Sequence, residues 1–191
     1  MKKYPLLSSI DSPADVKILD KTLLNDLSNE VSLYIQEVVK EKGGHFSSPL
    51  GVVDLTIALH YVYNSPDDKI IWDVGHQAYA HKIITGRREA FKEIRKKNSI
   101  SGFLKRDESP HDIFGAGHAS TSISSALGFA HARDWNDTNE QIVAVIGDGA
   151  MTGGLAYEGI NNLGYHKTQL TIVLNDNSHS ISKSVGALSH Y

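Results

Sequence analysis

The stretch Gln141-Ile142-Val143-Ala144-Val145-Ile146-Gly147-Asp148-Gly149 decides the expected fold, because an apolar run ends abruptly in an acidic residue between two glycines. Such a short apolar run is typical of a strand buried in a parallel sheet. A second run, Leu170–Leu174, resembles it and is followed by Asn175-Asp176-Asn177. The two stretches therefore predict strands that end in oxygen-bearing side chains.

Residues 152–163 lie between these strands and have the spacing of a helix, with Thr152 suited to the N-cap position. A strand, a helix and a strand in this order form a right-handed crossover, which brings both strand ends to one edge of a parallel sheet. We therefore expect an α/β fold in which a parallel sheet is flanked by helices. The helix should bury one face, formed by Leu155, Ala156, Gly159, Ile160 and Leu163.

The side chains at this edge suit a magnesium ion and a phosphate. Asp148 offers a carboxylate and the segment Asn175–Asn177 one or two amide oxygens, and hard divalent cations such as Mg²⁺ prefer oxygen ligands. Gly147 and Gly149 allow the backbone to approach an anion closely. Asp148 alone would be a common loop or capping residue, so the functional interpretation depends on the second strand end.

A histidine and a glycine-rich loop are further candidates for the site. His76 follows the predicted strand Lys69–Gly75, at the end where open α/β sheets bind ligands. Residues 114–122 form a glycine-rich loop that leads into a helix of small residues, and the N–H groups at the start of that helix suit the oxygens of a diphosphate. Close packing of the helix against the sheet explains its small residues equally well.

His45 lies in a loop between two predicted helices. Apolar residues predict a helix over 23–42 that ends at Gly43-Gly44, and Ser48-Pro49 begins a second, largely buried helix that extends to residue 62. A single histidine beside glycines is more often a loop residue than a catalyst, so this pattern alone assigns His45 no function.

The composition excludes several classes of protein. The chain has 191 residues, 40% apolar and 21% charged, as expected for one globular domain with a core. A net charge of −3, without basic stretches interleaved with aromatic residues, argues against nucleic-acid binding. No cysteine is present to form a disulfide, and the H-E-x-x-H and G-x-S-x-G motifs are absent. No apolar run reaches the ~20 residues of a membrane span, so we expect a cytoplasmic protein that does not bind membranes.

Several stretches together resemble the N-terminal part of the 1-deoxy-D-xylulose-5-phosphate synthase family of transketolase-like enzymes. Gly147-Asp148-Gly149 followed by Asn177 is the thiamine diphosphate motif that such enzymes share, whereas Trp72–Tyr79 and Ser180-Ile181-Ser182 are particular to the synthases. The resemblance covers nearly the whole chain. Its motifs are Gly43–Phe46, Leu50–Thr56, Ile71–Tyr79, Ser101–Phe103, Phe114–His118 and Asn175–Ser178.

The resemblance implies a transketolase-like, thiamine diphosphate-binding fold that is incomplete here. Residues 1–22 would be an N-terminal arm and residues 23–191 a diphosphate- and magnesium-binding domain, without the aminopyrimidine-binding and C-terminal domains. The family condenses pyruvate with D-glyceraldehyde 3-phosphate, with loss of CO₂, to give 1-deoxy-D-xylulose 5-phosphate for isoprenoids, thiamine and pyridoxal. This chain would supply the magnesium and diphosphate half of the site, would be inactive alone, and would form a homodimer and dock with the missing domains.

The family's site residues carry over by position. Asp148, the side chain of Asn177 and the backbone carbonyl of His179 would bind Mg²⁺. His76 would contact the coenzyme, and His45 would lie beside the thiazolium for substrate binding or proton transfer, so both histidines are candidate catalytic residues. One departure is Ala119, where the family has serine. The coenzyme would be bound by His76, Gly117, His118, Ala119, Gly149, Ala150 and Asn177.

Two other functions remain open. The chain would be a non-catalytic α/β coenzyme-binding or assembly module if these residues are relics, an alternative favoured by the missing catalytic glutamate. It would otherwise be the subunit of a split transketolase, which the product of a reconstituted enzyme would reveal. An N-terminal fragment, a truncated form and one piece of a split enzyme all fit the sequence, and each predicts an exposed apolar face where other parts dock.

Overall fold

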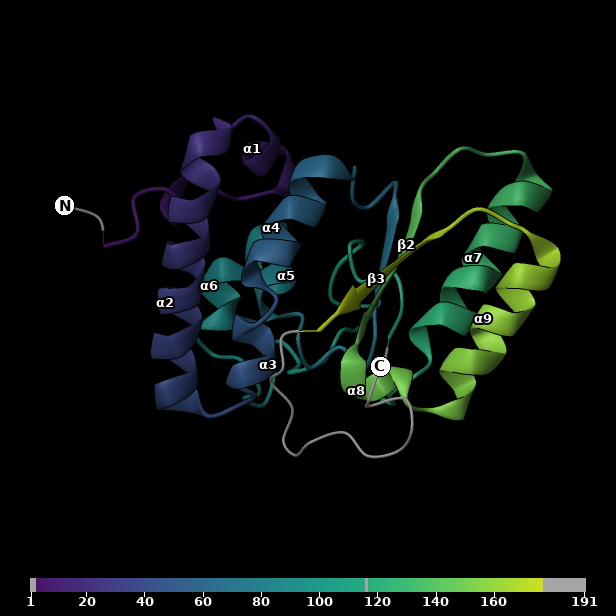
Figure 1. Cartoon of the computed structure of the whole chain (residues 1–191). Coiled ribbons are helices and arrows are strands. Elements are labelled where there is room, and N and C mark those ends of the chain that lie inside the picture. The colour runs from purple at the N-terminus through teal and green to yellow at the C-terminus, as the bar shows by residue number, and fades with distance from the viewer. Residues whose placement is uncertain (1–2, 116, 177–191) are drawn as a thin grey trace. The chain divides into compact units, whose positions relative to one another are not determined.

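The computed structural model describes residues 3–115 and 117–176 of the chain (Figure 1). These residues belong to two compact units: unit 1 comprises Met1–Ser65 and His76–Leu104, and unit 2 comprises Pro66–Gly75 and Lys105–Tyr191. Neither boundary falls at residue 22. The division into an arm, 1–22, and one domain, 23–191, stays a prediction.

Unit 1 is helical, and its long helix α2 confirms the helix predicted over 23–42. The buried residues of α2 include Leu27, Val31 and Ile35, and they follow the predicted apolar stripe. Gly43 ends the helix with a φ of 77°, a conformation that favours glycine. The elements of unit 1 are η1 (Leu7–Ser9), α1 (Pro13–Lys17), η2 (Lys21–Leu23), α2 (Leu24–Lys42), α3 (Ser47–Leu50), α4 (Val53–Val62), α5 (Tyr79–Lys82), η3 (Ile83–Arg87) and α6 (Arg88–Phe91).

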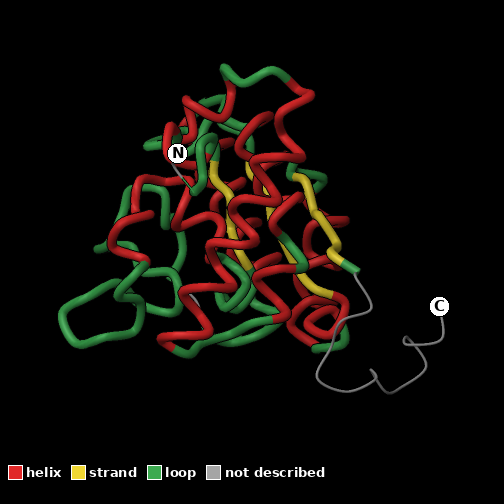
Figure 2. The backbone as a smooth tube through the Cα atoms, turned by 90° about the vertical axis from the view of Figure 1, so that its left-hand side faces the viewer, coloured by secondary structure: helices red, strands yellow, loops and turns green. Residues whose placement is uncertain are grey.

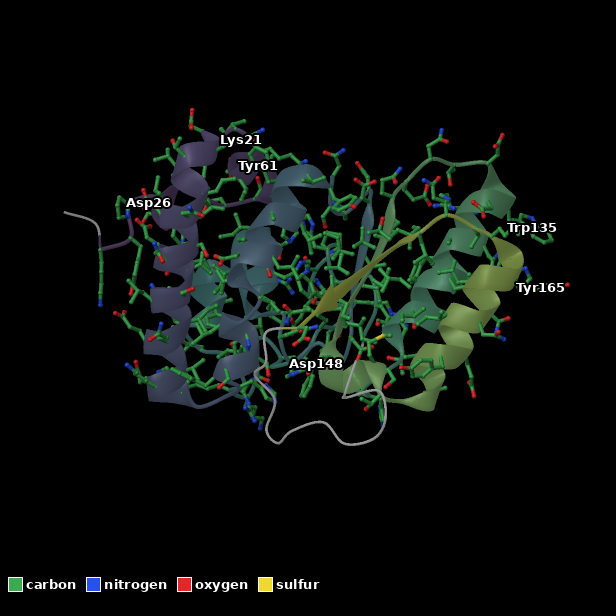
Figure 3. The ribbon with its side chains drawn as sticks, viewed as in Figure 1. Lys21, Asp26, Tyr61, Trp135, Asp148 and Tyr165 are labelled. Atoms are coloured by element: carbon green, nitrogen blue, oxygen red, sulfur yellow. The ribbon has the colours of Figure 1, made fainter. Side chains whose placement is uncertain are left out.

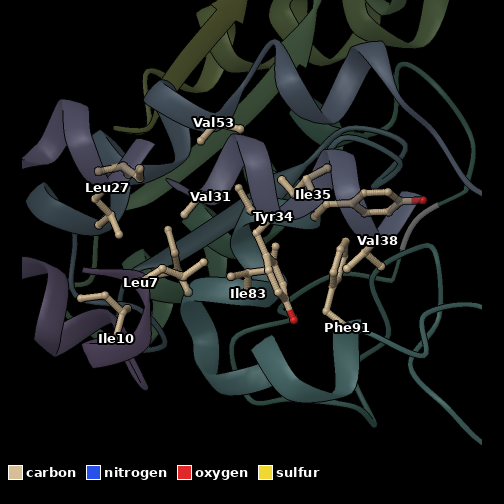
Figure 4. Packing of buried hydrophobic residues seen from close by; sticks show 14 of the residues in the cluster. Leu7, Ile10, Leu27, Val31, Tyr34, Ile35, Val38, Val53, Ile83 and Phe91 are labelled. Atoms are coloured by element: carbon tan, nitrogen blue, oxygen red, sulfur yellow. The ribbon is translucent and has the colours of Figure 1, made fainter. Parts of the chain in front are cut away.

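Apolar residues near the start of unit 1 contribute to its core. Leu7, Ile10 and Val16 are almost completely buried and pack in the cluster that α2 and α4 also line (Figure 4). Ser12 and Asp15 form a capping box at the start of α1, which stabilises this short helix.

The second predicted helix is split into α3 and α4. Val52, with φ −127° and ψ 11°, departs from the helical conformation between them, and α4 begins only at Val53. Helix α4 contacts α1, α2 and α5 and buries Val53, Thr56, Ile57, Leu59 and His60. Ala58 and Val62 are exposed, so the helix is less buried than its sequence predicts.

The described residues of unit 2 form a parallel sheet of three strands in the order β1-β2-β3, which confirms the predicted fold class (Figures 1 and 2). The strands are β1 (Lys69–Trp72), β2 (Ile142–Gly147) and β3 (Thr171–Asn175), and the helices are α7 (Ser122–Asn136), α8 (Asp148–Met151) and α9 (Gly154–His166). The central strand β2 is almost wholly buried, whereas β3 lies at the edge, half-buried or exposed.

Helix α7 packs against β1 and β2, and α9 packs against α7. The two helices approach closely at Gly159, where an added Cβ would lie 2.9 Å from a side-chain carbon of Ile123. Of the face predicted for α9, only Ala156 and Gly159 are buried. Thr152 is not its N-cap, because α9 begins after Gly153.

Large apolar residues remain exposed on unit 2. Trp135 on α7 and Tyr165 on α9 are 90% and 81% exposed (Figure 3). Within the part of the chain that the structure describes, no helix has the length and apolar character needed to span a membrane.

Candidate functional site

The carboxyl ends of β2 and β3 lie side by side, as the sequence predicts. Gly147 is opposite Asn175 in the parallel register. Asp148 follows directly and is half-buried as the first residue of α8 (Figure 3). Asn177 and His179 lie outside the described residues. Asp148 is therefore the one predicted magnesium ligand that the structure places at this edge. Asn175 and Asp176, which precede the other two predicted ligands in the sequence, are the last residues described there.

The one predicted ligand that the structure describes, the carboxylate of Asp148, is a donor type that suits a hard divalent cation. Among residues 3–115 and 117–176, no group of three or more histidine, cysteine or acidic side chains is placed to hold a metal. Two of the three predicted ligands are outside those ranges, so the metal site stays a prediction.

The short helix α8 is a feature that the sequence did not predict. It turns the chain immediately after β2, so that Gly149 and Ala150 lie in its single turn. An added Cβ at Gly149 would meet nothing within 4 Å. The hydroxyl of Thr152 donates a hydrogen bond of 2.7 Å to the carbonyl of Gly149 and ties the end of the turn to its beginning. The backbone at Gly149 is thus open to a ligand.

The glycine-rich loop borders a hollow of about 320 Å³ that is lined by Phe114, Gly115, Gly117, His118 and Thr121. Gly117, His118 and Ala119 are exposed. No atom lies within 4 Å of a Cβ built at Gly117. The loop can therefore approach a ligand with its backbone, which is what the predicted diphosphate contacts require.

The side chain of Asp73, a residue that the sequence analysis missed, lies at the start of α7. It follows β1, which ends at Trp72 rather than at Gly75 because Val74 and Gly75 have positive φ values of 59° and 86°. The Asp73 carboxylate is 1% exposed. It accepts hydrogen bonds from the backbone N–H groups of Ser120, at 2.8 Å, and Ser122, at 3.0 Å.

These two bonds limit which N–H groups near the start of α7 are available to a diphosphate. The N–H groups of Ser120 and Ser122 already donate to Asp73. The loop residues 117–119, which come before them, are consequently the part of this segment that is suited to an anion.

His45 and His76 come together in unit 1. Their ring centroids are 5.4 Å apart, and the Phe103 ring lies 5.5 Å from His45. The backbone N–H of His45 donates to the hydroxyl of Tyr79 at 3.2 Å, and that hydroxyl lies 3.4 Å from His45 Nδ1. Two candidate catalytic residues that are far apart in the sequence thus share one aromatic cluster.

The surroundings of His45 favour a neutral imidazole. Burial lowers the pKa of His45 below its usual 6.5, and the positive charge of Arg95 lowers it further. A neutral imidazole can accept a proton or a hydrogen bond near pH 7. The site residues therefore form two groups: the pair His45 and His76 in unit 1, and Asp148 to Ala150 with the loop 117–119 in unit 2.

Comparisons with known proteins agree on one family. Residues 7–191 match the family model described as 1-deoxy-D-xylulose-5-phosphate synthase. The chain is 58% identical over 186 residues to 1-deoxy-D-xylulose-5-phosphate synthase 2 of Geobacter sulfurreducens, which is 97% of this chain and 30% of that protein. It is 56% identical over 188 residues to the synthase of Chlorobaculum tepidum, which is 98% of this chain and 30% of that protein. The chain thus spans about 30% of the length of these relatives.

The fold has a counterpart among solved structures. Transketolase from Campylobacter jejuni matches with a TM-score of 0.74 and 21% sequence identity, covering 85% of this chain and 29% of that one. At this identity the likeness shows the fold alone. It confirms the predicted transketolase-like α/β fold, of which the chain contains a part.

Proposed function

Since the chain belongs to the 1-deoxy-D-xylulose-5-phosphate synthase family, we propose that it supplies the magnesium and diphosphate half of a thiamine diphosphate site. The observation that carries this proposal is the register of Gly147 opposite Asn175. It supports a common edge for Asp148 and for the segment that contains Asn177 and His179.

The residues of unit 2 would hold the coenzyme by its charged end. Asp148, the side chain of Asn177 and the backbone carbonyl of His179 would bind Mg²⁺, a cation that proteins usually hold through carboxylates together with phosphate groups of a ligand. The open backbone at Gly117 and Gly149 supports diphosphate binding by residues 117–119 and 149–150. Asn177 would contact the diphosphate as well as the metal.

The histidines of unit 1 would act at the part of the coenzyme that reacts with the substrate. The coenzyme, when bound, supplies carbanion chemistry that no amino acid side chain offers. His76 would contact it, and His45, held neutral by burial and by Arg95, would bind substrate or move a proton. The Tyr79 hydroxyl, which accepts the backbone N–H of His45, would keep that residue in place.

For the complete protein we propose the reaction that the family name implies. It would condense pyruvate with D-glyceraldehyde 3-phosphate, release CO₂ and form 1-deoxy-D-xylulose 5-phosphate, a precursor of isoprenoids, thiamine and pyridoxal. We also propose that it works in the cytoplasm as a homodimer, with this chain docked to the domains that complete the site.

The test is to identify the product of the full-length protein with thiamine diphosphate, Mg²⁺ and both substrates. We expect 1-deoxy-D-xylulose 5-phosphate and CO₂ in equal amounts, and neither from Asp148→Ala. Asp26→Ala removes an exposed carboxylate from α2 and should act like the unchanged protein. Transfer of a ketol group between sugar phosphates without CO₂ would instead indicate a transketolase. A folded protein that forms no product and binds no coenzyme would be an assembly module.

A further inference from the structure

The carboxylate of Asp73 is fixed at the end of the sheet of unit 2. Its backbone N–H donates to the carbonyl of Val145 on β2 at 2.8 Å and extends the ladder between β1 and β2 by one bond. Each carboxylate oxygen then accepts one backbone N–H of the segment that starts α7, from Ser120 and from Ser122. The glycine-rich loop is thereby attached to the sheet at the residue that follows Ala119.

Ser120 continues this connection to the turn that carries Asp148. Its hydroxyl donates a hydrogen bond of 2.6 Å to the carbonyl of Ala150 in α8. Ser120 has a φ of 71° and is only 6% exposed. This backbone conformation favours glycine, so a serine here indicates that its hydroxyl contributes something that glycine would lack.

The absence of a side chain at Gly153 leaves room for the Ser120 hydroxyl. A Cβ built at Gly153 would lie 2.1 Å from Ser120 Oγ and 2.9 Å from Ser120 Cβ. The N–H of Gly153 donates to the same Ala150 carbonyl at 3.2 Å. The carbonyl of Ala150 therefore accepts hydrogen bonds from both Ser120 and Gly153. A side chain at position 153 would displace the Ser120 hydroxyl and break its bond.

We propose that Asp73 and Ser120 are positioning residues that lock the loop 117–119 to the turn 148–150, so that the diphosphate and magnesium halves of unit 2 are held together before the coenzyme binds. The inference rests on the proposed function and names two residues outside the predicted ligand set. A site that is ordered in advance binds more tightly, because its groups lose less freedom on binding. Loss of the link should therefore weaken coenzyme binding without unfolding the protein.

Two substitutions separate the hydroxyl of Ser120 from its backbone conformation. Ser120→Ala removes the hydroxyl and keeps the unfavourable φ, whereas Ser120→Gly removes the hydroxyl and relieves the backbone. If only the backbone conformation matters, Ser120→Gly should bind as well as the unchanged protein. The matched control is Ser125→Ala, because the Ser125 hydroxyl also donates to a backbone carbonyl, that of Thr121, within α7.

The experiment uses the full-length protein and has two readouts. Calorimetry with thiamine diphosphate and Mg²⁺ should show affinity about tenfold weaker for both Ser120 variants, equivalent to about 1.4 kcal/mol, and unchanged for Ser125→Ala. Asp73→Asn should weaken binding similarly, and adding Ser120→Ala to it should weaken binding little further, since both changes break one network.

The second readout is amide hydrogen exchange without ligand. Exchange in residues 147–153 should rise in both Ser120 variants and stay unchanged in Ser125→Ala, with unit 2 unaffected outside this turn and the loop 117–119. Unchanged exchange there would overturn the inference, and so would a rise throughout unit 2, which would indicate only a structural role. If the unchanged protein binds no coenzyme, the proposed function fails, and exchange alone then decides whether the link exists.

Discussion

The backbone N–H of His45 donates a hydrogen bond to the hydroxyl of Tyr79, a side chain of α5 that is completely buried. The same hydroxyl lies 3.4 Å from His45 Nδ1 and would lie 2.8 Å from a Cβ added at Gly44. One buried phenol thus touches both the backbone and the ring of a candidate catalytic residue, and it restricts the residue before it to glycine.

Tyr79→Phe should release His45 while the protein stays folded. It removes one hydrogen bond, which is worth about 1 kcal/mol of unfolding free energy, and it frees the imidazole to adopt other orientations. Chemical denaturation measures the first effect and the NMR signals of the His45 ring measure the second. The control is Tyr61→Phe, which removes a hydroxyl from a partly buried tyrosine of the same unit. A His45 ring signal unchanged by Tyr79→Phe would contradict the positioning role of Tyr79.

The pKa of His45 should rise when Arg95 is replaced by glutamine. The positive charge of Arg95 lowers this pKa, but burial is the larger cause, so in Arg95→Gln it should rise and stay below 6.5. Because the folded pKa lies below the unfolded one, the unfolded state takes up the proton first. The contribution of His45 to stability is therefore intact above about pH 6.5 and is lost as the pH falls towards the folded pKa. NMR titration of His45 tests this, and a pKa above 6.5 in the unchanged protein would refute it.

Substitution by alanine should change the free energy of unfolding differently at two adjacent glycines, Gly153 and Gly154. Gly153→Ala forces a Cβ against Ser120 and should destabilise the protein by about 1–3 kcal/mol. Gly154→Ala places a Cβ where nothing lies within 4 Å, at the start of α9, and should be neutral or stabilise by up to about 1 kcal/mol. Ser120→Gly should recover part of the loss in Gly153→Ala, because it removes both atoms that the new Cβ would meet. Thermal denaturation of the variants and the double variant measures this, and equal effects of the two alanines would rule it out.

Helix α9 contains a second pair of glycines for the same comparison, Gly159 where it packs on α7 and Gly164 where no atom lies near. Gly159→Ala would place a Cβ 2.9 Å from Ile123 and Ser124 of α7, so the helices must separate at a cost of about 1–3 kcal/mol. At Gly164 no atom lies within 4 Å of the new Cβ, and Gly164→Ala should stabilise by about 0.5–1 kcal/mol through helix propensity. Urea unfolding of both variants is sufficient, and a destabilised Gly164→Ala would show that α9 has a neighbour on that face.

The parts of the fold that the sequence predicted are those with local signals. An apolar run that ends in glycine and an acidic residue marked β2 and Asp148, and the stripe of apolar residues marked α2. The parallel pairing of β2 with β3 followed from the crossover rule. The sequence did not predict that β3 lies at the edge of the sheet and is only partly buried. Leu170–Leu174 resembles β2 in composition, and the burial of a strand depends on which elements lie beside that strand.

The parts that the sequence missed depend on partners far along the chain. Asp73 binds N–H groups 47 and 49 residues away, and neither its spacing nor its neighbours distinguish it from any acidic residue after a strand. Tyr79 reaches His45 across 34 residues. The positive φ of Ser120 was also invisible, since a serine there suggests no left-handed turn. A search for acidic residues directly after buried strands would have included Asp73 as a candidate.

The most direct measurement is a calorimetric titration with thiamine diphosphate in the presence and absence of Mg²⁺, on the unchanged protein, Asp148→Ala and Asp26→Ala, each shown by circular dichroism to be folded. The proposed site requires saturable binding that depends on Mg²⁺, that survives in Asp26→Ala, and that weakens more than about 100-fold in Asp148→Ala, since even outer partners of a metal site change affinity 10–100-fold. Binding that is independent of Mg²⁺, or equally strong in Asp148→Ala, would contradict a magnesium and diphosphate site at the ends of β2 and β3.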